Sequence, residues 1–106
     1  MVRVRRPYRH TAGFADFYEF DKHYQKHKAE HPDFGRPFRY AQFADSFCGG
    51  PLGPHMIEHV RGDDGATVRF DTHRQIAGVL HLGRVIGTCH LRQRNGLTWF
   101  QRQQLR

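Results

Sequence analysis

Three histidines recur at every fourth residue of the chain: His23, His27 and His31. Residues four apart share one face of an α-helix, so His23 and His27 are predicted to point to the same side. Three interpretations are open: a solvated polar face, a zinc pair that needs a third ligand, or an acid–base pair. Pro32 ends the helix near His31, and no His-Glu-x-x-His arrangement is present, which counts against zinc. Acid–base chemistry suits histidine because its unperturbed pKa lies near neutral pH.

RNA is a substrate for which such a pair would be enough. Its 2′-hydroxyl is a built-in nucleophile beside each phosphodiester, so cleavage requires a base, an acid and a cation or donor for the phosphorane, but neither metal nor cofactor. The predicted helices and strands contain residues of the required types: the histidines His23 and His27, the cation Arg69 and the hydroxyl donor Thr88. Alternation along a strand places Arg69 on the face opposite Val68 and Phe70, where a solvent-facing arginine is the alternative.

The charge balance points to a polyanionic partner. Lysine and arginine number 17 against 10 acids, a net charge of +7, and 14 of the 17 are arginine, the better fork for phosphate. Nucleic acid is therefore expected before membrane, although a basic composition can also serve solubility alone. The candidate RNA-binding residues are Tyr24, Tyr40 and Trp99, which could stack on a base or pack in the core, together with Arg84, His90 and Arg92.

The two cysteines, Cys48 and Cys89, exclude a four-cysteine zinc site because neither belongs to a closely spaced pair. We expect them to be buried and reduced, with one disulfide as the alternative. No apolar run approaches the length of a membrane span, so no membrane partner is predicted. The chain has no apolar signal core at its start, so delivery to another cell would depend on a longer parent chain.

The hydrophobic pattern predicts one α+β domain over residues 1–106. A basic arm over residues 1–14 precedes a helical half over 15–48, with helices near 15–30 and 37–47. An antiparallel sheet is expected over 55–103, because the segments alternate and are separated by turn residues. Its expected strands are Ile57–Arg61, Thr67–Phe70, Ile76–Leu82 and Val85–Leu91, followed by an Asn95-Gly96 hairpin leading to Thr98–Phe100.

The order of several short motifs resembles a known family. In the first half they are Phe20-Asp-Lys-His23-Tyr-Gln-Lys-His27, then Phe34-Gly35, then Tyr40-Ala41-Gln-Phe-Ala44-Asp-Ser-Phe47. In the second half they are Val68-Arg69-Phe70-Asp71, Gly78-Val79-Leu80, Arg84-Val85-Ile86-Gly87-Thr88 and Trp99-Phe100-Gln101. Over residues 17 to 103 this order resembles bacterial polymorphic toxin domains of the barnase/EndoU/colicin/RelE-like superfamily of ribonucleases.

The resemblance implies two N-terminal helices packed on a twisted antiparallel sheet of four or more strands. It also implies a metal-independent endoribonuclease that cleaves RNA, often tRNA, in the cytoplasm of a target bacterium and has an acidic cognate immunity protein. By position, His23 or His27 would be the acid–base group, Arg69 would bind phosphate and Thr88 would hydrogen-bond it. Two departures are the glycines and prolines of residues 48–54 and Cys89-His90-Leu91-Arg92 after the threonine, which leaves His90 as a substitute second histidine. The alternative functions are a non-catalytic RNA- or DNA-binding module and a protein–protein adaptor whose basic surface meets an acidic partner.

Overall fold

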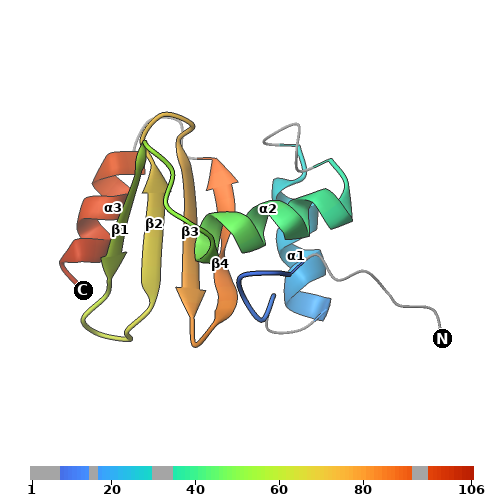
Figure 1. Cartoon of the computed structure of the whole chain (residues 1–106), viewed down its shortest axis with the longest axis horizontal. Helices are drawn as coiled ribbons and strands as arrows, with labels where there is room; N and C mark the ends of the chain where they lie inside the picture. The colour runs from blue at the N-terminus through green and yellow to red at the C-terminus, as the bar shows by residue number, and fades with distance from the viewer. Residues whose placement is uncertain (1–7, 15–16, 30–34, 92–95) are drawn as a thin grey trace.

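A computed structural model describes residues 8–14, 17–29, 35–91 and 96–106 of the chain; the side chains of Phe17, Glu19 and residues 86–91 lie outside this description. The elements follow the order α1 (Phe17–His27), α2 (Pro37–Gly49), β1 (Met56–Val60), β2 (Thr67–Asp71), β3 (Ile76–His81), β4 (Arg84–Leu91) and α3 (Gly96–Gln104). The α+β fold with two helices ahead of an antiparallel sheet is therefore confirmed (Figure 1).

The four strands form a meander in the order β1-β2-β3-β4, and every neighbouring pair is antiparallel. Arg69, at the middle of β2, pairs with Glu58 of β1 and with Gly78 of β3. The tight β3–β4 turn places Leu82 and Gly83 at positive φ, a conformation that a glycine adopts without strain. This topology puts β1 and β4 at opposite edges of the sheet.

Side-chain alternation gives the sheet two buried faces. Val68, Phe70 and Phe100 belong to one apolar cluster, which lies between the sheet and α3. The second cluster joins Tyr40 and Phe47 of α2 to strand residues on the opposite face. In Figure 1, α2 lies across the sheet, and α1 stands at the β4 end beside it. The α2 face therefore carries the two N-terminal helices, and the other face carries α3.

The close approach of α2 to the sheet requires a glycine. A Cβ added at Gly78 would lie 2.7 Å from Cys48 Sγ and 3.0 Å from Phe47 Cδ1, distances that side chains do not tolerate. Cys48 is buried, as the sequence predicted, whereas the side chain of Cys89 lies outside the described residues. Gly78 thus lets α2 lie directly on β3.

The segment before α1 belongs to the fold and is not a loose arm. The buried carboxylate of Asp45, in α2, accepts the backbone N–H groups of Arg9 (2.8 Å), His10 (3.0 Å) and Thr11 (2.8 Å) and the Thr11 hydroxyl (2.7 Å). Phe14, three residues later, is only 5% exposed. The expected basic arm is thus held by the core over residues 8–14, the condition under which it was expected to be ordered; residues 1–7 lie outside the description.

The expected hairpin at Asn95-Gly96 and the strand after it are wrong, because Gly96 begins α3. A side chain at Gly96 would collide with the Phe70 ring, so the glycine serves close helix–sheet packing and not a turn. Gly96, Phe100 and Gln103 are the buried residues of α3, and their spacing follows a helical period. The sheet thus ends with β4, short of the residue 103 that the sequence predicted.

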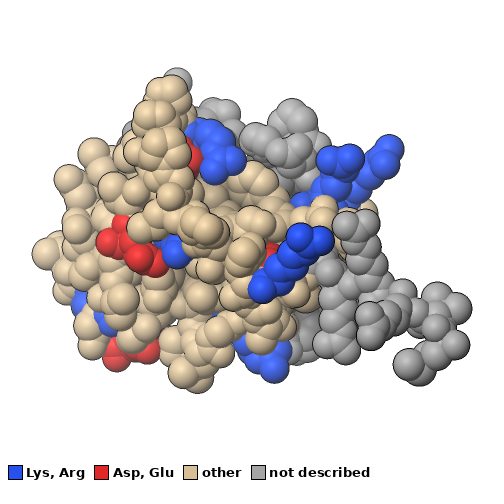
Figure 2. All heavy atoms as spheres, viewed as in Figure 1, with Lys and Arg blue, Asp and Glu red and all other residues tan. Residues whose placement is uncertain are grey.

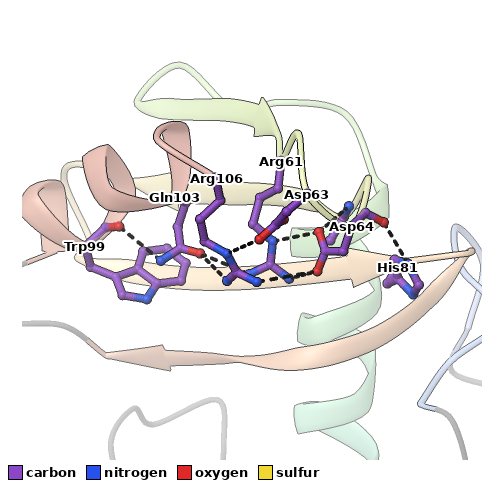
Figure 3. A network of polar contacts seen from close by, with 8 residues as sticks. Arg61, Asp63, Asp64, His81, Trp99, Gln103 and Arg106 are labelled. Carbon is purple, nitrogen blue, oxygen red and sulfur yellow. Dashed lines mark hydrogen bonds and ion pairs between the residues drawn. The ribbon is translucent and has the colours of Figure 1, made fainter.

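A polar network fastens α3 to the β1–β2 turn (Figure 3). Arg61 donates to Asp64 through Nε (3.0 Å) and to Gln103 Oε1 of α3 (3.0 Å), while Arg106 Nε donates to Asp63 (2.7 Å). The hydrogen bond from Arg61 is the main cause that holds the pKa of Asp64 well below its usual range. The network therefore fixes the end of the chain to the first hairpin.

We predict that Asp45→Asn lowers the free energy of unfolding by about 3 kcal/mol, because hydrogen bonds to a buried charged acceptor are lost. Chemical denaturation monitored by circular dichroism measures the change. Asp21→Asn is the control, since Asp21 is exposed on α1, and we expect it to stay within about 0.5 kcal/mol of wild type. Equal stability of the two variants would contradict the anchoring role of Asp45.

Stability should also depend on pH through Asp64. A carboxyl whose folded pKa is depressed contributes stability above its ordinary pKa of about 3.9, and loses it as pH falls toward the folded value. Thermal melts between pH 7 and pH 2 should show Asp64→Asn less stable than wild type near neutrality, with the difference in Tm shrinking below about pH 4. A difference that stays constant down to pH 2 would show that the charge of Asp64 contributes nothing.

Candidate functional site

The two histidines of α1 lie side by side, as their spacing predicted. The ring centroids of His23 and His27 are 6.2 Å apart, and the ring planes are within 8° of parallel. His27 is 6% exposed, and His23 is more accessible. His31 lies outside the described residues. A parallel imidazole pair with one accessible member is the first component of a candidate site.

The segment before α1 supplies a ring, that of Phe14, which lies against His23. Val85 N–H donates to the Gly13 carbonyl (2.9 Å), so the backbone of residues 12–14 runs beside the start of β4. The Phe14 ring is thereby fixed 6.0 Å from the His23 ring and 5.9 Å from the Tyr40 ring. His23 is therefore positioned by packing against a segment that pairs with β4, and His27 stacks on His23.

Arg84 brings a positive charge to the same junction. It begins β4, is exposed, and donates from Nη1 to the carbonyl oxygen of Phe14 at 3.3 Å. His23 meets the ring of Phe14, and Arg84 meets its carbonyl, so one residue links the imidazole and the guanidinium. The sequence named Arg84 as an RNA-binding residue, and the structure places it at the start of β4 in contact with Phe14, whose ring lies against His23.

Arg69 lies elsewhere and has a structural role. Its side chain is directed to the α2 face, as alternation predicted, but Nη1 donates to the carbonyl oxygens of Phe47 (3.0 Å) and Gly50 (2.6 Å). Nε donates to Glu58 of β1 at 3.0 Å, and the residue is 9% exposed. These contacts tie the end of α2 to the β1 side of the sheet, whereas α1 packs at β4. The expected convergence of Arg69 with the histidines is not found in this structure.

The three aromatic candidates have different environments. Tyr40 is fully buried at the centre of the core, so of the two roles expected for it core packing is the one found, and its ring is not accessible to a base. Tyr24 is half-buried on α1, where its hydroxyl donates to the Gly35 carbonyl (3.1 Å) and Lys28 Nζ lies 5.9 Å from its ring. Trp99 is partly exposed in α3, on the opposite side of the sheet from α1. Only Tyr24 shares an element with the histidine pair.

The remaining candidates lie in or after β4. Thr88 and His90 belong to this strand, and the backbone of His90 pairs with Ala77, but both side chains lie outside the described residues. Arg92 lies outside the description altogether. Because α1 packs against β4, Thr88 occupies the strand next to the histidine pair.

Sequence reasoning missed a groove of about 540 Å³ between α2, the segment before β1 and the turn after β2. Two arginines line it, Arg39 of α2 and Arg74 of the turn. Nearby in the chain, the exposed rings of His55 and His73 stack with centroids 4.2 Å apart. The sequence did carry one signal for this groove: Arg39 and Phe43 are four residues apart, so they share one face of α2.

None of the helices in the described residues has the length and apolar character needed to cross a membrane. In the same part of the chain, no group of three or more His, Cys, Asp or Glu residues is placed to hold a metal ion. Comparisons of the chain with protein-family models, curated proteins and solved structures found no match.

We predict that Arg69→Ala lowers the free energy of unfolding by about 3 kcal/mol, because two backbone carbonyls and Glu58 lose a charged donor. Arg69→Lys should recover only part of this, since an ammonium cannot reproduce the guanidinium fork. Urea denaturation measures both variants, with the exposed Arg102→Ala of α3 as the control. An Arg69→Ala protein as stable as the control would return Arg69 to the list of candidate phosphate ligands.

Proposed function

We propose that the protein is a metal-independent endoribonuclease whose acid–base pair is His23 and His27. The observation that carries the proposal is the parallel imidazole pair, 6.2 Å apart, beside the strand that bears Arg84 and Thr88. Histidine pairs of this kind can move protons in both directions near neutral pH. The resemblance to toxin ribonucleases supports the same residues and the same reaction class.

The chemistry assigned to the pair conserves every atom of the RNA. One imidazole removes the proton of a 2′-hydroxyl, whose oxygen attacks the adjacent phosphorus. The second imidazolium gives a proton to the 5′-oxygen as the P–O5′ bond breaks, which leaves a 2′,3′-cyclic phosphate and a free 5′-hydroxyl. His23 is the more accessible of the two, and His27 is buried beside it.

Arg84 is the cation that we assign to the phosphate in place of Arg69. It is exposed and lies at the junction of α1 with β4, whereas the Arg69 guanidinium is bound to α2 carbonyls and to Glu58. A guanidinium there would stabilise the charge that develops on the phosphorane. Thr88 remains the candidate hydrogen-bond donor by virtue of its position in β4.

The proposed substrate is RNA, with tRNA favoured by the resemblance, and the proposed protein partner is an acidic immunity protein. The surface charge supports both. Figure 2 shows lysine and arginine side chains at several places on the described part of this face, including the side where α1 and α2 lie. We further propose, on the resemblance alone, that the domain acts in the cytoplasm of a target bacterium as the C-terminal part of a secreted protein.

The second candidate function is RNA binding without cleavage, which the arginine-lined groove favours. This function needs only exposed guanidinium groups and a surface for bases, and the histidines would then be incidental. It predicts binding that weakens steeply with salt and leaves the nucleic acid intact.

The test is to incubate the purified protein with total tRNA in EDTA and to analyse the fragment ends. We expect 2′,3′-cyclic phosphate ends from wild type, and a rate reduced by about 10² to 10⁴ in His23→Ala and His27→Ala. Arg84→Ala should slow the reaction as well. His10→Ala is the control, because His10 is an exposed histidine held through its backbone N–H.

Melting temperatures distinguish a chemical effect from misfolding, since His27 is buried and its replacement can destabilise α1. His23→Ala, at the more accessible position, is the cleaner variant. Absence of cleavage by wild type, or a rate for folded His23→Ala equal to that of His10→Ala, would remove the catalytic assignment. Intact tRNA that still binds would favour the second candidate.

A further inference from the structure

We propose that the groove beside α2 is a separate subsite for one unpaired nucleotide of single-stranded RNA, with Arg74 stacking on the base and Arg39 binding the phosphate. This inference rests on the proposed function only in its choice of RNA. The groove itself is defined by α2, by residues 51–56 and by the turn after β2. Its volume of about 540 Å³ lies within the roughly 300–1,000 Å³ of small-ligand sites.

The turn after β2 is built around Asp71, which holds Arg74 in place. The buried carboxylate accepts the backbone N–H groups of His73 (2.9 Å) and Arg74 (2.8 Å), and it accepts Arg74 Nε at 2.9 Å. Burial alone would raise the pKa of Asp71, but these hydrogen bonds outweigh it and lower the pKa below its usual value. Arg74 is therefore oriented by a charged anchor before any ligand arrives.

Arg74 is supported by an aromatic surface. Its guanidinium carbon lies 5.2 Å from the Phe43 ring centroid and 5.9 Å from that of Phe47, and these two rings stack 5.8 Å apart. The Arg74 side chain is still 46% exposed. A planar guanidinium supported on one side by aromatic rings is a platform on which an unpaired base can stack.

The polar groups on α2 complete the requirements for a nucleotide. Arg39 lies one helical turn before Phe43 and is exposed, so its fork can reach a phosphate at the mouth of the groove. Gln42 and Ser46, also four apart, offer hydrogen-bonding groups to a base edge. Among the described residues that line the groove there is no carboxylate, so its charge is complementary to RNA.

The stacked rings of His55 and His73 extend this surface. His55 precedes Met56, which lines the groove, and His73 precedes Arg74. Thr72 donates to the His55 carbonyl from both its backbone N–H (2.9 Å) and its hydroxyl (3.0 Å), which joins the two segments. A second planar, exposed pair next to the groove is consistent with a strand of RNA that continues past one nucleotide.

The test uses a fluorescein-labelled pentauridylate with 2′-O-methyl groups, which cannot be cleaved, so binding is measured on the wild-type protein by anisotropy. We expect Arg74→Ala and Arg39→Ala each to weaken binding about tenfold, and Arg102→Ala of α3 to change it less than twofold. Arg74→Lys should weaken binding nearly as much as Arg74→Ala, because it keeps the charge and loses the planar surface. Arg39→Ala should lower the slope of log affinity against log salt by about 0.7, because it removes one phosphate contact to a single strand, whereas Arg74→Ala should change the slope much less.

One further variant and one competition experiment test whether a loss of binding comes from the groove itself. Phe43→Leu removes the nearer of the two rings that support Arg74 without touching Asp71, and should also weaken binding; melting temperatures of all variants establish that they are folded. Inorganic phosphate should compete far more weakly than uridine monophosphate. Wild-type affinity in the folded Arg39→Ala and Phe43→Leu variants, an equal loss in Arg102→Ala, or equal competition by phosphate would each overturn the proposal.

Cleavage of tRNA distinguishes this inference from the proposed function. If wild type cleaves tRNA while the groove variants bind the oligonucleotide normally, the groove proposal fails and the ribonuclease stands. If wild type binds through the groove and leaves tRNA intact, the ribonuclease fails and the groove stands. When both hold, Arg39→Ala should raise KM with little change in kcat.

Discussion

The buried guanidinium of Arg69 fixes where α2 lies on the sheet, and the rest of the structure depends on that position. The last carbonyls of a helix lack partners within the helix. Here Arg69 supplies donors to the carbonyls of Phe47 and Gly50 and binds Glu58 on the neighbouring strand. One planar cation thus supplies hydrogen bonds to carbonyls at the end of α2 and links β2 to β1. Glu58 neutralises its buried charge.

A second buried charged residue, Asp45, joins α2 to the segment before α1. Asp45 binds the backbone of residues 9–11, and this places Phe14 beside β4. The His23 ring lies against Phe14 and the His27 ring stacks on His23, so the position of the histidine pair depends on where α2 sits and what its carboxylate holds. The groove on the opposite flank of α2 depends on the same helix, because Arg39 and Phe43 are two of its lining residues. Both candidate sites are therefore coupled to one docking arrangement.

Local periodicity was enough to predict most elements but not the long-range roles of their polar residues. Helical spacing correctly paired His23 with His27, and alternation correctly oriented Arg69, because both signals depend on neighbours a few residues away. The partners of Arg69 are 19 and 22 residues earlier in the chain, so its structural role could not be read locally. Gly96 was misread as a turn residue because its use, contact with the Phe70 ring, is also long-range.

The chain has a net charge of +7, but not every arginine is available to a ligand. Several arginines form ion pairs with acids of the same chain. Glu58 binds Arg69, Asp64 binds Arg61 and Asp63 binds Arg106, all in the hairpins and near α3. Asp45 binds backbone N–H groups, so within the described contacts its charge serves the fold. Arg39 and Arg84 stand exposed beside α2 and at the α1–β4 junction, and Arg74 is held by Asp71 in an orientation that leaves it accessible. Among the described contacts, these acids therefore bind arginines near α3, while Arg39, Arg74 and Arg84 are exposed where the two proposed RNA contacts lie.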